Sequence, residues 1–330
     1  HLLLVARSGI GTNTINIDAC TQNGTAVFNT PGANANAVKE LVLQVLFTTA
    51  RPLQAAINHT AGLKGDHLQQ QAEATRYQFI GHELYGKTIG IIGLGAIGQR
   101  LADSCYHLGM QVVGYNRSPK KLQFVQQLET IEDVLAAADF VVLLLPLTES
   151  TEGLMNADRF RLMRKDAVLL NFGRGELVDN AAVIDALNQG QFQQYITDFP
   201  TTALREQGHV VMLPHLGGNT VEALSQSANL TLQNTRDFLE TGVIRASVKS
   251  RSAIWNDIAT VLSRHHVPVL EMISNMRGDH GYMLVNIDLL KPHLTAEDTN
   301  RLIQEISSID GAIRVRILTN PSVLSTHLNA

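Results

Sequence analysis

The glycine-rich segment Gly93–Gly98 is the first feature of the sequence that could do chemistry. It reads Gly-Leu-Gly-Ala-Ile-Gly, follows the strand-like run Thr88–Ile92 and leads into a helical pattern that ends near Leu108. A dinucleotide-binding turn requires this context: the glycines let the backbone approach a pyrophosphate, and a helix N-terminus directs free N–H groups at the phosphates. The alternative is a glycine turn in an unrelated α/β fold. We expect cofactor contacts at the three glycines of the segment, Gly93, Gly95 and Gly98.

The residues about 20 positions further on should decide which dinucleotide fits. A strand-like run ends at Tyr115 and is followed by Asn116, Arg117 and Ser118. An acid at this place would bind the ribose hydroxyls and repel a 2′-phosphate. Asn116 carries no charge, and Arg117 with Ser118 could bind a 2′-phosphate. Alternatively, Arg117 is a solvated loop charge and NAD binds. The residues leave NAD and NADP both open.

Two more polar side chains follow apolar runs. Arg174 stands in Asn171–Gly175, and His215 stands in Pro214–Gly218. At the carboxyl end of a strand, the arginine fork could bind the carboxylate of an α-keto acid, and the histidine could exchange a proton near neutral pH. Alone, Arg174 fits a salt-bridged surface arginine equally well, and His215 fits an ordinary polar residue. The hypothesis that Arg174 and His215 are catalytic therefore depends on their occurring in the same chain as the glycine turn.

Alternating elements must position these residues. Strand-like runs cover 87–92, 111–115, 140–145, 168–171, 195–198 and 210–213. Helical patterns cover 131–137, 181–188 and the stretch that follows Gly98 to about Leu108. Continuous apolar runs such as Phe140–Leu145 are typical of parallel strands buried on both faces. The alternation predicts an α/β fold with a doubly wound parallel sheet. The stretch 122–128 is ambiguous, and 58–78 is polar and Gln-rich, which predicts a surface helix or loop.

The flanks follow other patterns. Residues 1–33 read strand, loop, short helix, strand and turn, and 34–49 have helical spacing. A long helix, capped by Asn219 or Thr220, should extend to about Thr241. Residues 253–319 read helix, strand, strand, helix, strand, with central strands at 267–276 and 282–289 and a near capping box at the start of helix 295–307. This pattern predicts a separate small α+β module.

Composition excludes several classes of protein. The chain has 330 residues, of which 45% are hydrophobic and 17% charged, with a net charge of −4, as in a compact soluble protein without the basic excess of a nucleic-acid binder. The apolar run Phe140–Leu145 is far shorter than the ~20 residues of a membrane span. Cys20 and Cys105 lack metal-ligand spacing, which favours neither a disulfide scaffold nor a metal site and fits a reducing cytoplasm. No charged region precedes Leu2–Val5, so we expect no signal peptide and a start within a domain.

The order of these motifs, with Asp198 between the last two, resembles the D-isomer-specific 2-hydroxyacid dehydrogenases. Asn29–Leu41 and Tyr195–Pro200 resemble, within that family, the D-3-phosphoglycerate dehydrogenases. The resemblance implies oxidation of D-3-phosphoglycerate to 3-phosphohydroxypyruvate with NAD, or possible use of NADP, in serine biosynthesis. One alternative is an NADPH-dependent glyoxylate or hydroxypyruvate reductase. Another is a catalytically weak cofactor-binding or assembly protein.

The resemblance also implies a domain plan. Residues 1–33 would be the remnant of a flavodoxin-like substrate domain, 34–216 a Rossmann domain, 217–246 a helix returning to the substrate domain, and 247–330 a ferredoxin-like ACT regulatory module. A homodimer or homotetramer in the cytoplasm, and an amino-acid effector at the ACT-like module, are implied in the same way. Residues 248–252 are too short and polar for a clear first ACT strand, and Ala253–Asn256 replaces the glycine of the effector site, which favours a packing role between subunits.

By the same resemblance, His215 takes the C2 hydroxyl proton during oxidation and Arg174 holds the substrate carboxylate and polarises the C2 oxygen. Asp198 would hold the nicotinamide carboxamide. Ala96 and Ile97 would lie at the pyrophosphate. The remaining cofactor residues would be Asn116, Arg117, Phe172, Gly173, Gly217 and Gly218, and the substrate loop would be Ser8, Gly9 and Ile10. The family pairs its histidine with a glutamate, whose place Thr202 takes here. Unless Glu206 substitutes for it, we expect reduction to shift to lower pH.

Overall fold

The computed structural model describes residues 2–12, 14–23, 25–241, 254–267, 269–277, 280–287, 295–309 and 315. Contacts group the chain into two compact units, residues 34–224 and residues up to 33 together with those from 225 onward. The finer division predicted from the sequence stays a prediction. None of the helices within the described ranges is long and apolar enough to cross a membrane.

The unit 34–224 is built on a parallel sheet whose strands have the order β5-β4-β3-β6-β7-β8-β9. This arrangement confirms the doubly wound α/β fold. Because the strand order reverses between β3 and β6, the carboxyl ends of these strands flank the crevice where such folds bind ligands. The strands are β3 (Thr88–Ile92), β4 (Gln111–Tyr115), β5 (Gln126–Gln127), β6 (Phe140–Leu143), β7 (Val168–Asn171), β8 (Gln194–Thr197) and β9 (Val210–Met212).

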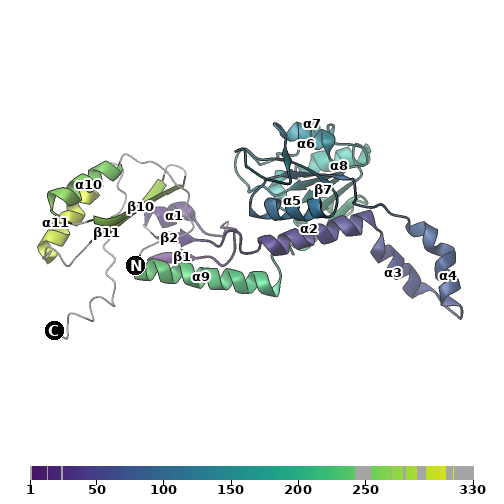
Figure 1. Cartoon of the computed structure of the whole chain (residues 1–330), viewed down its shortest axis with the longest axis horizontal. Helices are drawn as coiled ribbons and strands as arrows, with labels where there is room; N and C mark the ends of the chain where they lie inside the picture. Colours follow the sequence, from purple (N-terminus) through teal and green to yellow (C-terminus); the bar gives the residue numbers. More distant parts are fainter. Residues whose placement is uncertain are drawn as a thin grey trace. The chain divides into compact units, whose positions relative to one another are not determined.

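Helices cover both faces of this sheet (Figure 1). On β3, Ile89 and Ile91 face one side, and Ile92 faces the other; all three are fully buried. A Cβ on Gly90 would lie 2.6 Å from Val134, so glycine lets a helix approach the strand closely. The helices are α2 (Ala35–Ala50) and α5 (Ala96–His107) on the first face, and α6 (Ile131–Ala137) and α8 (Asn180–Asn188) on the second.

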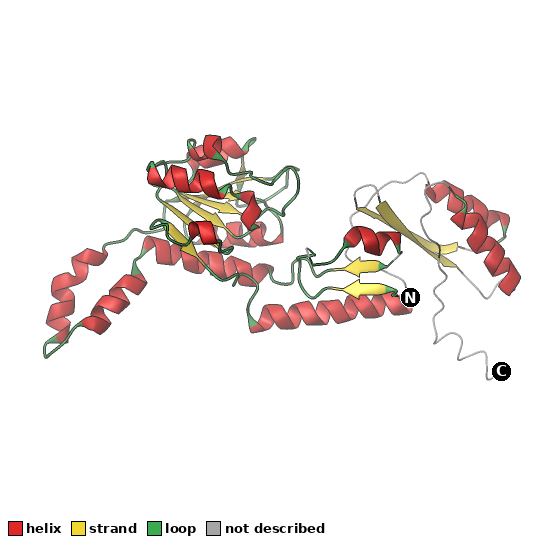
Figure 2. Ribbon diagram, turned by 180° about the vertical axis from the view of Figure 1, so that it is seen from behind, coloured by secondary structure: helices red, strands yellow, loops and turns green. Residues whose placement is uncertain are grey.

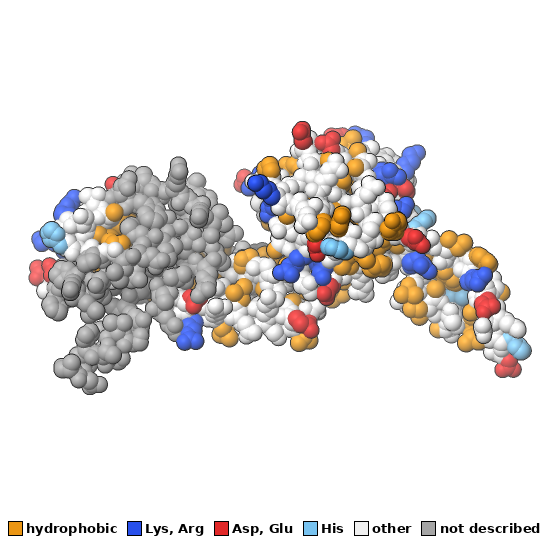
Figure 3. Space-filling model, viewed as in Figure 1, with side chains coloured by type: hydrophobic (Ala, Val, Ile, Leu, Met, Phe, Trp, Pro, Cys, Tyr) orange, Lys and Arg blue, Asp and Glu red, His pale blue; other side chains and the backbone are white. Residues whose placement is uncertain are grey.

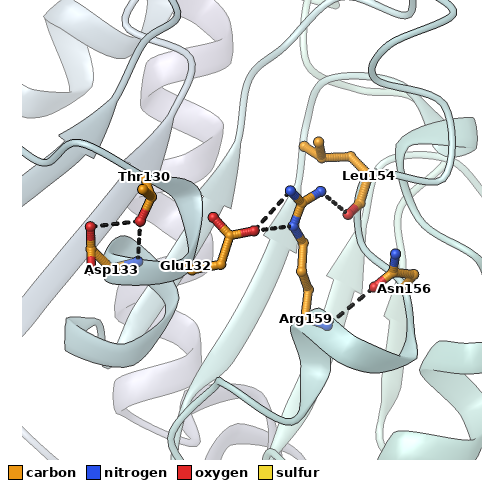
Figure 4. Close-up of polar contacts among 6 residues, drawn as sticks. All are labelled: Thr130, Glu132, Asp133, Leu154, Asn156 and Arg159. Atoms are coloured by element: carbon orange, nitrogen blue, oxygen red, sulfur yellow. Dashed lines mark hydrogen bonds and ion pairs between the residues drawn. The ribbon is translucent and has the colours of Figure 1, made fainter.

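Polar contacts join the start of α6 to the short helix α7 (Ala157–Phe160), as Figure 4 shows. The Thr130 hydroxyl caps α6, and the Asn156 side chain caps α7. Arg159 lies 2.9 Å from the Glu132 carboxylate and donates to the Leu154 carbonyl at 2.7 Å. The backbone N–H of Glu132 and the Arg159 guanidinium hold the pKa of the Glu132 carboxyl below its usual value. These contacts fix one end of the second helical layer.

Both cysteines are free. Cys105 lies within α5 and packs against the sheet, and burial raises the pKa of its thiol to about 12. A protonated, buried thiol behaves as a small apolar side chain. Cys105 therefore belongs to the core.

A helical hairpin extends from the end of α2 away from the sheet, as Figures 1 and 2 show. It consists of α3 (Leu53–Gly62), α4 (Leu68–Thr75) and η1 (Arg76–Phe79), and none of their residues is buried. The His59 Nε2 atom lies 2.9 Å from the Thr75 hydroxyl and joins the two arms. The polar stretch 58–78 thus forms two helices and a 3-10 turn rather than one helix or loop.

In the other unit, β1 (Leu4–Ala6) and β2 (Ala26–Phe28) form a parallel pair on either side of α1 (Ile17–Gln22) in sequence. The long helix α9 (Val221–Thr241) follows Thr220, whose hydroxyl accepts the N–H of Ala223. This contact identifies Thr220, not Asn219, as its cap.

The carboxyl-terminal region has the expected helix, strand, strand, helix order. Its elements are α10 (Ile254–Arg264), β10 (Val269–Arg277), β11 (His280–Ile287) and α11 (Ala296–Ser307). The two strands pair antiparallel, and Thr295 with Asp298 forms the capping box of α11. In sequence, β10 ends at Arg277 and β11 begins at His280, so fewer residues separate the two strands than predicted. The stretch 248–252, and the expected last strand apart from residue 315, lie outside the described residues.

Candidate functional site

The glycine turn after β3 has the geometry of a phosphate-binding loop. Gly93 has φ +108°, and a Cβ there would lie 2.9 Å from the Leu144 backbone. A Cβ on Gly98 would lie 2.2 Å from the Gly93 carbonyl oxygen, so this glycine closes the turn. Gly95 is exposed with open space around it and starts α5 without a side-chain cap. Uncapped N–H groups beside open space fit the pyrophosphate of a dinucleotide.

Asn116 braces this turn from the end of β4. Its Oδ1 atom accepts the Leu94 N–H at 3.2 Å, and its Nδ2 atom donates to the Ser118 carbonyl at 2.7 Å. The Gln127 side chain accepts the Lys120 N–H at 2.9 Å and donates to the Lys120 carbonyl. The loop that follows β4 is therefore anchored at both ends.

This anchored loop is basic. Arg117 and Lys121 are exposed, and Lys120 is half-buried. Within the part of the chain that the structure describes, none of the three forms an ion pair with an acid. Unpaired cations on a fixed loop can bind an added phosphate at little cost in ordering.

Arg174 lies between β7 and the 3-10 turn η2 (Gly175–Leu177) and is half-buried. Its guanidinium donates to the Gly173 carbonyl at 2.7 Å, and no acid among the described residues pairs with it. Among the described residues, Arg174 is therefore not a salt-bridged surface arginine. Arginine has five N–H donors, so others remain for a carboxylate.

The fully buried Asn171 holds the Arg174 loop. Its Nδ2 atom donates to the Arg174 carbonyl at 2.8 Å and to the Tyr195 hydroxyl at 3.4 Å, and its Oδ1 atom accepts the Gly173 N–H at 3.2 Å. Burial raises the pKa of Tyr195, which keeps its hydroxyl neutral. Residue type alone does not single out Asn171; an amide at the end of an apolar strand is the signal that could find it.

Phe199 lies between the Arg174 loop and His215. Its ring centroid is 5.0 Å from that of the exposed His215 imidazole, and a Cβ on Gly175 would lie 3.2 Å from the Phe199 Cβ. The structure thus brings the Arg174 loop and His215 to one region at the carboxyl ends of β7, β8 and β9. Phe199 carries no chemistry-bearing group, so residue type alone did not single it out.

No carboxylate supports His215 within the described residues. Thr202 begins the turn η3 (Thr202–Leu204) and is exposed, and Glu206 is exposed beyond it. Glu206 forms no ion pair with His215. In this structure Glu206 therefore does not take the place of the glutamate that the family pairs with its histidine. The shift of reduction to lower pH stays a prediction.

Asp198 lies at the end of β8 and is only 2% exposed. Its two carboxylate oxygens accept the N–H groups of Leu216 and Gly217, each at 2.7 Å. The other expected cofactor positions lie at these strand ends: Phe172 and Gly173 are buried after β7, and Gly217 and Gly218 precede α9. The described residues contain no group of three potential metal ligands.

The expected substrate loop Ser8–Ile10 lies in the other unit. The Gly9 N–H donates to the Thr30 hydroxyl at 2.8 Å, and the Asn29 side chain donates to the Ile10 carbonyl at 3.0 Å. The exposed Arg7 places its Nε atom 3.9 Å from where a Gly9 Cβ would lie, and it pairs with no acid in the described part of the chain. This cation was missed, because a lone arginine before a loop carries little signal.

Comparison with known proteins gives consistent matches. Residues 53–217 match the model of the D-isomer specific 2-hydroxyacid dehydrogenase, NAD binding domain. A glyoxylate reductase from Thermococcus kodakarensis is 33% identical, over 72% of this chain and 74% of that protein. A D-3-phosphoglycerate dehydrogenase from Methanocaldococcus jannaschii is 32% identical over 72% of this chain, which spans about half (46%) of that relative.

A solved structure shows the same architecture. The NADPH-dependent glyoxylate/hydroxypyruvate reductase from Sinorhizobium meliloti, in complex with NADP and malonate, superposes with a TM-score of 0.64 at 26% identity. The match covers 76% of this chain and 80% of that one.

Proposed function

Because the chain belongs to the D-isomer specific 2-hydroxyacid dehydrogenase family, we propose that it oxidises D-3-phosphoglycerate to 3-phosphohydroxypyruvate. As a member of this family, the chain is a dehydrogenase or reductase of small 2-hydroxy or 2-oxo acids that uses NAD(P). The observation that favours a phosphorylated substrate is Arg7, which lies beside the Ser8–Ile10 loop and pairs with no acid among the described residues.

Each site residue has a role in this proposal. Arg174 binds the substrate carboxylate and polarises the C2 oxygen, as its free donors allow. His215 accepts the C2 hydroxyl proton in oxidation and returns it in reduction. A nicotinamide cofactor held by these residues would supply the hydride chemistry at C2, as acceptor in oxidation and as donor in reduction. Asp198 holds the carboxamide, and the glycine turn with Phe172, Gly173, Gly217 and Gly218 holds the rest of the cofactor.

The phosphate is the group that distinguishes this substrate from glyoxylate. A phosphate needs cations beyond the arginine that holds the carboxylate, and we propose that Ser8, Gly9 and Ile10 bind substrate with Arg7 supplying one such charge. Glyoxylate has no group for this cation. The residue therefore offers a direct test of the substrate class.

Replacing Arg7 by Gln is expected to raise KM for D-3-phosphoglycerate about tenfold, because one charge-assisted hydrogen bond worth ~1.5 kcal/mol is lost. Steady-state kinetics should show little change in kcat and unchanged kinetics with glyoxylate. The control is Arg161→Gln, an exposed arginine of the α7 region. Equal effects of Arg7→Gln on both substrates would contradict the assignment.

The second candidate is an NADPH-dependent reductase of glyoxylate or hydroxypyruvate. The basic loop after Asn116 favours it, and so do the reductases among the relatives. Rates with D-3-phosphoglycerate, glyoxylate and hydroxypyruvate, each with both cofactors, separate the two. A catalytically weak cofactor-binding or assembly protein would bind a cofactor and turn over none of these substrates.

We also propose that the hairpin α3–α4 is covered by a second copy of the chain. Six exposed apolar side chains lie on the hairpin and the end of α2, where hydrophobic atoms are visible in Figure 3: Phe47, Leu53, Ile57, Leu68, Tyr77 and Ile80. At roughly 100 Å² each they would bury about 600 Å² per copy, near the ~800 Å² per partner of a stable interface. A self-complementary patch gives a twofold homodimer.

Replacing Ile57 and Ile80 together by Lys is therefore expected to halve the mass of the oligomer, because four charges would enter a twofold apolar interface. Size-exclusion chromatography with light scattering measures this mass. Ala55→Lys, which adds a charge to an exposed residue on the other side of α3 from Ile57, should leave the oligomer intact. An unchanged mass in the double variant would show that the hairpin is not the interface.

The remaining expectations are proposals as well. The order of α10, β10, β11 and α11 supports an ACT-like module at 247–330, either holding an amino-acid effector or packing between subunits. We also propose a homodimer, or a homotetramer where this module pairs as well, and a cytoplasmic location.

A further inference from the structure

The carboxylate of Asp198 makes contacts that the expected cofactor role does not explain. Both of its oxygens accept N–H groups from successive residues, Leu216 and Gly217, at 2.7 Å. Two successive backbone N–H groups that converge on one anion form a concave nest, and bonds to an ionised acceptor are short and strong. Because Asp198 is almost fully buried, these bonds are also shielded from water.

The residue immediately before this pair is His215. Its φ is +56°, in the left-handed region that a residue with a Cβ rarely adopts. Such a conformation persists only where the surroundings impose it, and it is concentrated at functional sites. The two bonds to Asp198 hold the turn that imposes it.

Asp198 is itself fixed in place. Its N–H donates to the Asn171 carbonyl at 3.1 Å, and the same Asn171 holds the Arg174 carbonyl. The next residue, Phe199, lays its ring against the His215 imidazole. The segment Asp198–Phe199 thus contacts His215 and its turn in two ways. Asp198 binds the backbone of the turn, and Phe199 contacts the imidazole ring. Through Asn171, the same segment is linked to the loop that carries Arg174.

We propose that Asp198 is a positioning residue for His215: its carboxylate holds the left-handed turn that presents the imidazole, whether or not a cofactor is bound. This inference rests on the proposed catalytic role of His215. It goes beyond the expected contact of Asp198 with the nicotinamide, because each carboxylate oxygen has a second lone pair that stays available.

The test is Asp198→Asn in the full chain. The amide keeps one acceptor, but its NH2 group faces the second backbone N–H, so donor opposes donor and the turn loosens. We expect kcat to fall about 10²-fold, the cost of misplacing a catalytic group by ~1 Å. The dissociation constants of NADH and NADPH, measured by fluorescence quenching, should change much less than kcat, because the amide oxygen remains available to the cofactor carboxamide.

A second readout needs neither substrate nor cofactor. In NMR spectra of the free protein, the amide protons of Leu216 and Gly217 should move upfield and exchange faster in the variant. The His215 imidazole signal, assigned by its loss in His215→Asn, should also move. Asp179→Asn is the matched control, because Asp179 likewise accepts two successive N–H groups, at the start of α8, and its variant should leave kcat and these signals unchanged.

Gly217→Ala gives a milder perturbation of the same contact. A Cβ on Gly217 would lie 3.1 Å from the Asp198 Oδ2 atom, whereas a Cβ on Gly208 would meet nothing within 4 Å. We expect Gly217→Ala to lower kcat several-fold and Gly208→Ala to leave it unchanged. Unaltered His215, Leu216 and Gly217 signals in Asp198→Asn would overturn the positioning role. Weakened cofactor binding with unchanged kcat in Asp198→Asn would also overturn the positioning role. If the wild-type protein is inactive but the His215, Leu216 and Gly217 signals still move in Asp198→Asn, only the proposed function is refuted.

Discussion

Replacing His215 by Asn is expected to lower kcat about 10³-fold in both directions, because general acid–base catalysis by a positioned side chain contributes 10²–10⁴-fold. Asparagine tolerates the left-handed conformation of residue 215 better than other replacements, so the turn held by Asp198 should survive. The loss can then be assigned to the missing imidazole. Steady-state kinetics with saturating cofactor measure the effect.

The matched control is His209→Asn, an exposed histidine just before β9. It should change kcat less than twofold, and the cofactor dissociation constants of both variants should equal that of the wild type. A loss below about fivefold in His215→Asn would place the proton acceptor elsewhere, because even the weakest general acid–base contributions exceed that range. The role of Arg174 in binding the carboxylate would not be affected by that result.

The sequence predicted the sheet and its turns well because these elements leave strong local signals. The strand β7 and the helix α6 have the predicted bounds, and β3 differs by one residue. The apolar runs of β3 and β7 are buried on both faces, and glycines follow them at Gly93 and Gly173, so pattern and structure coincide.

The hairpin and the edge strand could not be predicted in the same way. No residue of α3 or α4 is buried in a core. Their sequences therefore lack the apolar periodicity from which a helix is predicted. The strand β5 consists of Gln126 and Gln127 and is defined by its pairing with Val113 and Gly114 of β4, not by its own composition.

At the site, residue type and strand position were enough to indicate the glycine turn, Arg174 and His215. The residues that hold them were missed because their roles come from pairing between strands. Asn171 stands opposite Thr197 in the sheet, which places its carbonyl at the Asp198 N–H. The sequence left open whether Glu206 supports His215, because proximity along a loop does not fix where a side chain extends, and the structure shows no ion pair between the two residues.

The anchored basic loop leads to the second large effect, on cofactor choice. Wild-type protein is expected to use NADPH at least as well as NADH, because Arg117 is unpaired and no carboxylate occupies the place of Asn116. The double variant Asn116→Asp, Arg117→Ser should shift the ratio of kcat/KM for NADPH to that for NADH about 10³-fold toward NADH. Loss of one cation and gain of one repelling carboxylate cost ~2 kcal/mol each, and 1.4 kcal/mol is tenfold.

The aspartate can keep the bond from the Leu94 N–H, because Asn116 accepts that bond through Oδ1, so the glycine turn should stay braced. Lys165→Ser, a loss of charge at an exposed residue remote from β4 in sequence, should leave the ratio unchanged. A wild type that strongly prefers NADH would show that Arg117 is a solvated loop charge. In that case the reductase alternative loses the observation that favours it, because the 2′-phosphate is the only part of NADPH that this loop could distinguish from NADH.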